Sequence, residues 1–117
     1  MRLVEIARFV DRVEEEAAFY RVLLGREPAN AWPGGAIFVD RGVKIFLHER
    51  YEPGEGDLPP EDHLAFAVED VDAACNALRQ QGLTIEVAPR DYYWGRSAYL
   101  RSPNGQLIEL IVETAEN

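Results

Sequence analysis

The sequence contains one pattern twice, and this repeat limits the possible folds more than any other feature does. Each half of the chain reads as a strand, a helix and then further short strands. An offset of 58 residues places Glu5 on His63, and towards the end of each half an offset of 63 residues places Phe46 on Glu109. Two copies of one strand-helix-three-strand unit predict a quasi-symmetric structure with its site between the copies.

The first half has the alternation and the turn residues of a small mixed unit. Asp11 and Glu14 have the spacing of a helix N-cap and its reciprocal partner, and Gly25 is expected to stop that helix. Arg41–Gly42 is typical of a tight hairpin turn. The expected elements are a strand at 3–10, a helix from about 13 to 24, a turn at 32–35, and strands at 36–40 and 43–48.

The second half repeats this order after a connection rich in proline, glycine and acids. Asp70 or Glu69 is expected to cap its helix, whose apolar positions include Cys75. The expected elements are a strand at 63–68, a helix from 71 that ends at Gly82, a short strand at 83–87, a strand that starts at Gly95, a turn at 102–105 and a last strand that reaches Val112.

The length of 117 residues is enough for one hydrophobic core and predicts one domain, 1–117. We expect a first module at about 1–50, a linker at about 51–61 and a second module at about 62–117. The fold class predicted is α+β, with two βαβββ modules whose curled mixed sheets surround a cavity. The site face of each first strand is small and polar, which suits a cavity wall.

The charge balance excludes several partners. Twelve basic against 21 acidic residues give a net charge of −9, which argues against nucleic acid and anionic membranes and also against polyanionic substrates. A single cysteine, Cys75, excludes a disulfide framework. No signal-peptide pattern and no apolar run of about 20 residues is present. We therefore predict a cytoplasmic protein whose ligand is a small molecule.

Glu109 is the residue that most needs an explanation. It lies in the middle of an apolar run, Leu107 to Val112, and a buried ionised carboxylate without a partner is costly. Glu5 and His63, which the repeat equates, begin the two first strands. If the sheets curl, these three groups converge, and two carboxylates with one imidazole suit Mn, Fe, Co, Ni or Zn. The alternative is that His63 binds backbone and Glu5 lies at a solvated edge.

Several other residues are candidates for roles in the same cavity. His48 shares a face with Phe46 and is a candidate acid/base, or it simply ends its strand towards solvent. Ser97 and Tyr99 alternate on one face of their strand. Trp32 and the cluster Tyr92–Trp94 suggest contacts with a flat or cationic ligand, or a dimer contact. The candidate ligand-binding residues are Trp32, Phe46, Tyr92, Trp94 and Ser97, and the candidate catalytic residues are His48 and Tyr99.

These motifs resemble the vicinal oxygen chelate superfamily, which includes glyoxalase I, bleomycin-binding proteins, extradiol dioxygenases and fosfomycin-resistance thiol transferases. The resemblance rests on the doubled unit, the strand His63–Val68, the segment Gly95–Tyr99, and the turn Pro103–Gly105 with Glu109 downstream. It covers nearly the whole chain. The fold that it implies is a pair of βαβββ modules around a cavity, usually in a homodimer.

The resemblance also implies a ligand set. Metal-binding members place ligands at positions that correspond to Glu5, Phe46, His63 and Glu109. Phe46 cannot bind a metal, so the four-ligand pattern of glyoxalase I is broken, and a three-ligand set of Glu5, His63 and Glu109 is expected. The resemblance therefore implies a metalloenzyme, a lyase, isomerase, dioxygenase or transferase. The alternatives are a metal-free binding protein of the bleomycin-resistance type and, third, a structural role without ligand.

Overall fold

The computed structural model of the chain describes residues 1–55, 58 and 60–114. It contains two compact units, which we name the first unit (Glu5–Asp62) and the second unit (Met1–Val4 with His63–Asn117). The predicted linker at 51–61 falls partly on residues 56, 57 and 59, which lie outside the described part. That the chain acts as one domain, 1–117, stays a prediction.

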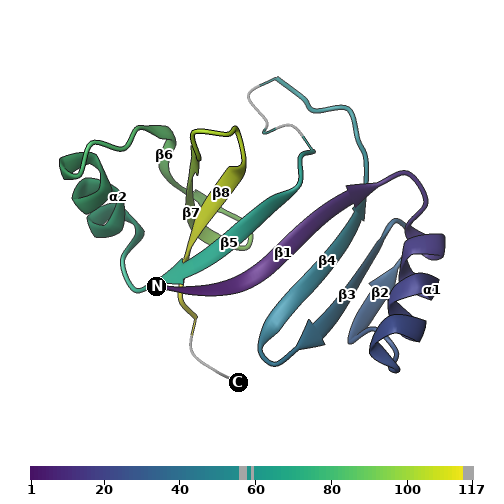
Figure 1. Cartoon of the computed structure of the whole chain (residues 1–117). Coiled ribbons are helices and arrows are strands. Elements are labelled where there is room, and N and C mark those ends of the chain that lie inside the picture. The colour runs from purple at the N-terminus through teal and green to yellow at the C-terminus, as the bar shows by residue number, and fades with distance from the viewer. Residues whose placement is uncertain (56–57, 59, 115–117) are drawn as a thin grey trace. The chain divides into compact units, whose positions relative to one another are not determined.

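The first unit is a four-stranded mixed sheet with one helix (Figure 1). β1 pairs with β4 in parallel, and β3 lies antiparallel between β4 and β2. Its elements are β1 (Arg2–Val10, which begins in the four residues grouped with the second unit), α1 (Val13–Leu24), β2 (Asn30–Trp32), β3 (Gly35–Asp40) and β4 (Val43–Glu49).

The second unit repeats this arrangement. β5 pairs with β8 in parallel, and β7 lies antiparallel between β8 and β6. Its elements are β5 (His63–Val68), α2 (Val71–Gln80), β6 (Ile85–Tyr92), β7 (Gly95–Arg101) and β8 (Leu107–Val112). The predicted α+β class with two βαβββ modules and mixed sheets is therefore confirmed.

The strand registers agree with the offsets that the sequence repeat gave. Ala7 is paired with Phe46 in the first unit, and Ala65 is paired with Glu109 in the second. Phe46 and Glu109 thus occupy the same place in their sheets. The repeat in the sequence therefore corresponds to a repeat of structure.

One face of each sheet is covered by its helix. In the second unit α2 contributes Val71 and Cys75 to a buried apolar cluster with residues of β5, β7 and β8, such as Val68, Ala98 and Leu110. Strand side chains alternate, so the residues between these point to the opposite face. That opposite face, which α2 leaves uncovered, carries the candidate site residues of the second unit.

The helix caps confirm one sequence prediction and contradict another. Asp70 precedes α2 and its carboxylate accepts a hydrogen bond from the backbone N–H of Ala73 at 3.0 Å, as predicted. The predicted cap at Asp11 is wrong, because the N-cap of α1 is Arg12, which makes no side-chain cap bond. Asp11 lies one residue too early to reach the helix and instead accepts from Arg50 Nε at 2.9 Å.

Two strands differ from the sequence expectation. β2 is a short strand paired with β3, where only a turn was predicted. β6 does not end at Val87 but continues to Tyr92, although it contains Pro89. β6 is the edge strand of its unit and its register shifts between Val87 and Arg90, so the missing N–H of Pro89 is tolerated there.

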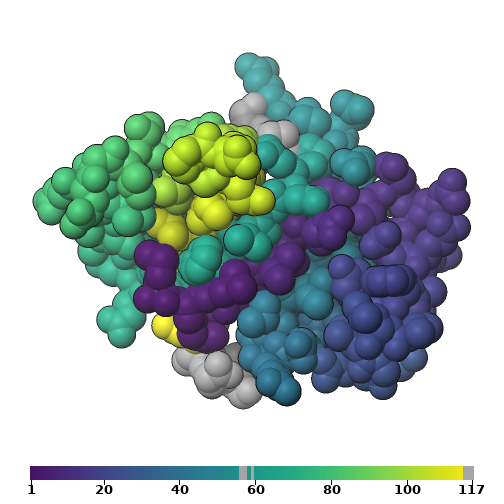
Figure 2. Space-filling model, in the orientation of Figure 1, coloured from purple at the N-terminus to yellow at the C-terminus, as the bar shows by residue number. Residues whose placement is uncertain are grey.

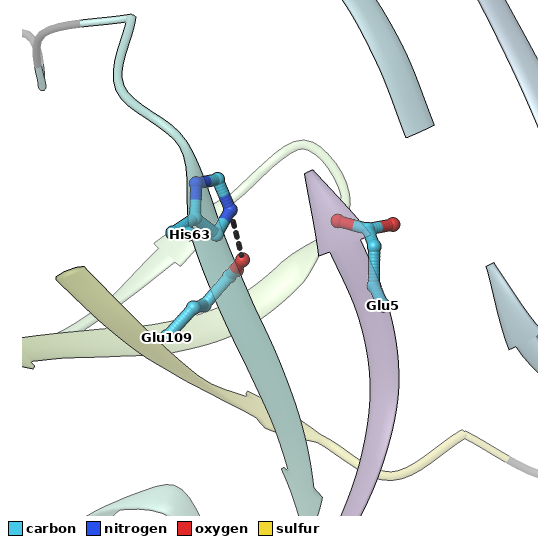
Figure 3. Close-up of side chains that lie close together, drawn as sticks. All are labelled: Glu5, His63 and Glu109. Atoms are coloured by element: carbon cyan, nitrogen blue, oxygen red, sulfur yellow. Dashed lines mark ion pairs between the residues drawn. The ribbon is translucent and has the colours of Figure 1, made fainter. Parts of the chain in front are cut away.

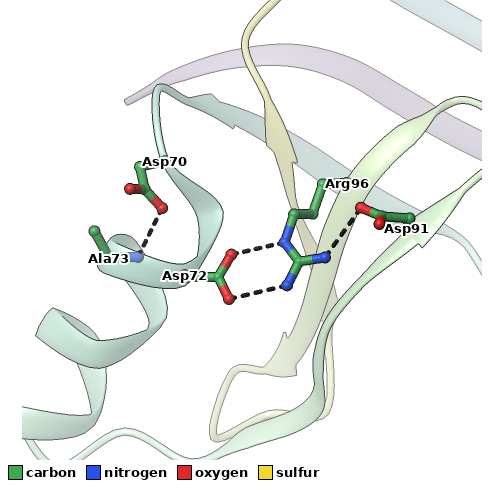
Figure 4. A network of polar contacts seen from close by, with 5 residues as sticks. All are labelled: Asp70, Asp72, Ala73, Asp91 and Arg96. Atoms are coloured by element: carbon green, nitrogen blue, oxygen red, sulfur yellow. Dashed lines mark hydrogen bonds and ion pairs between the residues drawn. The ribbon is translucent and has the colours of Figure 1, made fainter.

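Arg96 connects α2 to the hairpin of β6 and β7 (Figure 4). Its guanidinium donates to both oxygens of Asp72, at 2.7 and 3.0 Å, and to Asp91 Oδ1 at 3.0 Å. These hydrogen bonds hold the pKa of Asp72 below its usual value and raise the pKa of Arg96. The end of α2 that Asp70 caps is thereby fixed against the hairpin.

The exposed face of α1 is unusually apolar for a surface helix. Phe19, Val22 and Leu23 are 59%, 85% and 61% exposed. The buried face of α1 carries Ala17. In Figure 2 the purple-blue atoms of this segment lie at the surface of the first unit.

Within residues 1–55, 58 and 60–114, no helix has the length and hydropathy needed to span a bilayer.

Asp70→Ala is expected to lower the free energy of unfolding by about 1 kcal/mol, because the Ala73 N–H loses its acceptor. Asp11→Ala is the matched control, since it removes an exposed ion pair of small energetic value. Urea denaturation of both variants measures the difference. A larger loss for Asp11→Ala than for Asp70→Ala would contradict the observed caps.

Candidate metal and ligand site

The second unit brings His63 and Glu109 together on the face that α2 leaves uncovered. His63 Nε2 lies 3.2 Å from Glu109 Oε1, and the two side chains are 13% and 5% exposed (Figure 3). They come from the parallel neighbours β5 and β8, where Glu109 is paired with Ala65, two residues beyond His63. The pair is thus a diagonal contact across two strands. The predicted burial of Glu109 is confirmed.

The other oxygen of Glu109 is also occupied. Ser97 Oγ donates to Glu109 Oε2 at 2.8 Å, and Trp94 Nε1 donates to the same oxygen at 3.2 Å and to Ser97 Oγ at 3.1 Å. Ser97 is fully buried. The carboxylate is therefore held by two donors through Oε2, while Oε1 faces His63. The alternation in the sequence indicated Ser97, but no local pattern indicated the contact of Trp94.

The donor atoms of His63 and Glu109 fit adjacent ligands of one divalent ion. Imidazole nitrogen and carboxylate oxygen are common ligands of first-row metals. Two ligands at roughly 2.1 Å from an ion and at right angles would be about 3 Å apart, and Nε2 and Oε1 are separated by 3.2 Å. Ser97 and Trp94 orient the carboxylate from behind, as outer-shell partners of metal ligands do.

Aromatic rings line the same face of the second unit. Tyr99 on β7 is the strand partner of Glu109 on β8. Its ring makes edge contacts with His63 and Tyr92, at centroid distances of 6.3 and 6.1 Å. Tyr92 stacks on Trp94 at 4.4 Å with an interplanar angle of 7°. The guanidinium of Arg90 lies 4.8 Å from the centroid of the Tyr92 ring. These rings form a continuous wall beside the carboxylate.

Two register shifts in β6 precede Arg90 and Tyr92, one between Ile85 and Val87 and one between Val87 and Arg90. Val87 is paired with Tyr99 and Arg90 with Ser97, so three steps along β6 match two along β7. Because side chains alternate along a strand, one extra residue moves all later side chains to the other face. The earlier shift has the same effect, because two steps from Ile85 to Val87 match one step from Leu100 to Tyr99, so the two shifts cancel for the residues after Val87. Arg90 therefore lies on the face of its partner Ser97, and Tyr92, two residues further on, lies there too.

The first unit holds a second aromatic group on the face opposite α1. Phe46 contacts Trp32 and His48, with centroid distances of 5.9 and 5.5 Å, and His48 also contacts Phe9 at 5.4 Å. The Trp32 indole lies directly on Gly35, where a Cβ would be 2.3 Å from the ring. At the place that Glu109 occupies in the second unit, the first unit is therefore apolar.

His48 uses one ring nitrogen locally. Its Nδ1 lies 2.6 Å from the backbone carbonyl oxygen of Glu49. A carbonyl oxygen only accepts, so Nδ1 carries a proton and Nε2 is the acceptor of the neutral ring. His48 is the last but one residue of β4, and its half-buried imidazole packs against the rings of Phe9 and Phe46, unlike the solvent-facing strand end of the sequence alternative.

The predicted site residues fall into one group in each unit. Glu5 lies on β1, paired with Lys44, on the face that also carries Ala7 and Phe46. The second unit brings together His63, Tyr92, Trp94, Ser97, Tyr99 and Glu109, and the first unit contains Glu5, Trp32, Phe46 and His48.

A family model described as the Glyoxalase/Bleomycin resistance protein/Dioxygenase superfamily matches residues 2–110. A search of curated protein sequences finds no match.

Solved structures share the fold at low sequence identity. A hypothetical protein from Bacillus halodurans C-125 has 23% identity and a TM-score of 0.74, with 99% of this chain and 98% of that chain covered. Methylmalonyl-CoA epimerase from Mycobacterium tuberculosis has 23% identity and a TM-score of 0.70, with 97% and 89% covered. A Streptomyces coelicolor methylmalonyl-CoA epimerase variant in complex with 2-nitronate-propionyl-CoA has 24% identity and a TM-score of 0.64, with 98% of this chain and 99% of that chain covered.

Ser97→Ala is expected to lower the free energy of unfolding by about 1 to 3 kcal/mol, because a buried carboxylate oxygen loses its shorter hydrogen bond. Ser102→Ala is the control, since the Ser102 hydroxyl accepts a bond from the Gln106 N–H at a turn and does not touch the carboxylate. Chemical denaturation compares the two. Equal losses would show that the Ser97 bond to Glu109 has no special weight.

Proposed function

We propose, since the chain belongs to the Glyoxalase/Bleomycin resistance protein/Dioxygenase superfamily, that it is a metal-dependent enzyme acting on a small molecule with two neighbouring oxygen atoms. The observation that carries this proposal is the pair of His63 and Glu109, two metal-binding groups 3.2 Å apart and nearly buried. A purely structural ion pair would not need a face of small and hydroxyl-bearing side chains around it. Structural neighbours described as methylmalonyl-CoA epimerases agree with a small-molecule enzyme.

The proposed ligand set is Glu5, His63 and Glu109. Glu5 is included because the sequence repeat equates it with His63. Phe46 stands where Glu109 stands in the other unit, so the set stops at three and leaves positions for substrate oxygens. A divalent ion, Mn, Fe, Co, Ni or Zn, would stabilise negative charge that develops on those oxygens. The same proposal takes the 117 residues as one domain that works in a cytoplasmic homodimer.

The proposed proton-handling residues are Tyr99 and His48. Tyr99 is paired with Glu109 and packs against His63, so its ring lies beside the proposed ligands. His48 keeps Nε2 as an acceptor because Nδ1–H is bonded to backbone. Lyase, isomerase, dioxygenase and transferase reactions all fit a site that binds two oxygens and moves a proton.

The wild-type protein, purified without chelator, is expected to bind about one divalent ion per chain, because three ligands suffice for a catalytic site. Glu109→Gln and His63→Ala should lose this ion, whereas Ser102→Ala should keep it. Elemental analysis and calorimetric titration with Mn, Fe, Co, Ni and Zn measure the stoichiometry. A wild type that binds none of the five ions excludes the proposed mechanism.

A second function, a metal-free binding protein for an aromatic or cationic compound, is favoured by the aromatic rings on both units. Trp32 and Phe46 form an apolar contact surface in the first unit, and Tyr92 and Trp94 stack in the second. Flat and cationic molecules bind to such faces. The net charge of −9 favours a cation.

The binding function predicts that an aromatic cation such as ethidium quenches the fluorescence of Trp32 and Trp94 in metal-free protein. Single variants Trp32→Phe and Trp94→Phe assign the quenching to one unit, because each leaves one indole. An acidic aromatic of similar size, such as naphthalene sulfonate, is the control for charge. Quenching by neither compound in metal-free protein would count against the binding function and leaves the metal proposal intact.

A further inference from the structure

The Tyr92 hydroxyl is the feature of the second unit that neither the fold nor the ligand pair explains. Its oxygen is buried, yet it has no hydrogen-bond partner among the described residues. Buried tyrosine hydroxyls are nearly always bonded, because an unpaired one costs folding free energy. A hydroxyl without a partner in the protein is available to form a hydrogen bond with a ligand.

The position of the ring shows where that partner would come from. Tyr92 is stacked on Trp94, which donates to Glu109 Oε2, and its edge meets Tyr99, the strand partner of Glu109. On β6, Arg90 is paired with Ser97 and Tyr92 with Gly95, which places Tyr92 on the face of Ser97. The ring that carries this unsatisfied donor therefore lies on the face that carries the proposed metal ligands.

The neighbours of Tyr92 also fix its chemical form. Burial raises the pKa of the hydroxyl, with a smaller lowering effect of Arg90 and a raising effect of Glu109. The group therefore stays protonated near neutral pH and can donate. The guanidinium over its ring, at 4.8 Å, withdraws electron density and strengthens the O–H as a donor.

We propose that the Tyr92 hydroxyl donates a hydrogen bond to an oxygen atom of the bound small molecule, and that it thereby selects substrates with a third oxygen. The contacts run from His63 to Tyr99 and from Tyr99 to Tyr92, with centroid distances of 6.3 and 6.1 Å. Tyr99 thus separates Tyr92 from the metal-binding nitrogen, so the oxygen that Tyr92 binds differs from the two that would face the ion. The class of ligand is a small acid or keto acid, and this inference rests on the proposed function.

Tyr92→Phe tests the proposal, since phenylalanine keeps the ring and its stacking and removes only the oxygen. Wild type and variant are loaded with Zn²⁺ and titrated calorimetrically with two ligands. Oxalate has two more oxygen atoms besides the two that would bind the metal ion. Acetohydroxamate has no oxygen atom besides the two that would bind the ion. Oxalate affinity is expected to fall by about tenfold or more, the value of one hydrogen bond to a charged group. Acetohydroxamate affinity and Zn²⁺ affinity should not change.

Tyr93→Phe is the matched control, because Tyr93 is the next residue and its side chain is 98% exposed. It should bind both ligands as the wild type does. The melting temperature is a second readout, and Tyr92→Phe should melt at the wild-type temperature or above, since it removes an unpaired buried group. A fall of several degrees would overturn the proposal, because the hydroxyl would then have a structural partner.

A wrong role for Tyr92 and a wrong metal site give different experimental results. If wild type and Tyr92→Phe bind Zn²⁺ and bind oxalate equally, the role of Tyr92 is wrong and the metal site stands. If the wild type binds no metal, the proposed function is wrong. The titration is then read on metal-free protein, where a tenfold loss of oxalate affinity in Tyr92→Phe supports the donor role and equal or absent binding overturns it.

Discussion

A carboxylate buried in a β-strand is the constraint around which the second unit is built. Glu109 is 4% exposed, and it is stable there because Ser97 and Trp94 donate to one oxygen while His63 faces the other. These partners come from β5, β7 and the turn before β7. Their strands must therefore be correctly paired before the carboxylate is satisfied, and a site with fixed donor geometry follows from the same pairing.

The two faces of the sheet in the second unit have different roles. Towards α2 the strands present an apolar cluster that includes Val68, Ala98 and Leu110, and Arg96 fixes the helix to the hairpin. The other face carries His63, Ser97 and Glu109, with the short side chain Ala65 as the strand partner of Glu109. The helix side therefore serves folding alone, whereas the other face serves binding and, through the bond of Ser97 to Glu109, folding as well.

The helix caps show how far local patterns reach. Asp70 was predicted to cap α2 and does so, because the cap immediately precedes the first helical residue. Asp11 has the fuller capping pattern, with Glu14 three residues later, yet the N-cap is Arg12 and the Asp11 carboxylate binds Arg50 instead. The strand β2 was missed since its only support is pairing with β3. A local pattern fixes an element where the competing contacts are few, and it fails where a distant residue offers an equal partner.

The sequence alone determined the repeat, the order of the elements other than β2, and the identity of Glu109 as a buried carboxylate with His63 on its face, because these depend on alternation and spacing along the chain. The structure decided which groups reach that carboxylate. Trp94 lies fifteen positions away, and its bond to Glu109 depends on how β7 and β8 pair. Val87 is paired with Tyr99 and Arg90 with Ser97 only because the register of β6 shifts twice. Neither a register shift nor an indole contact leaves a periodic trace in the sequence, so the tertiary structure had to supply both.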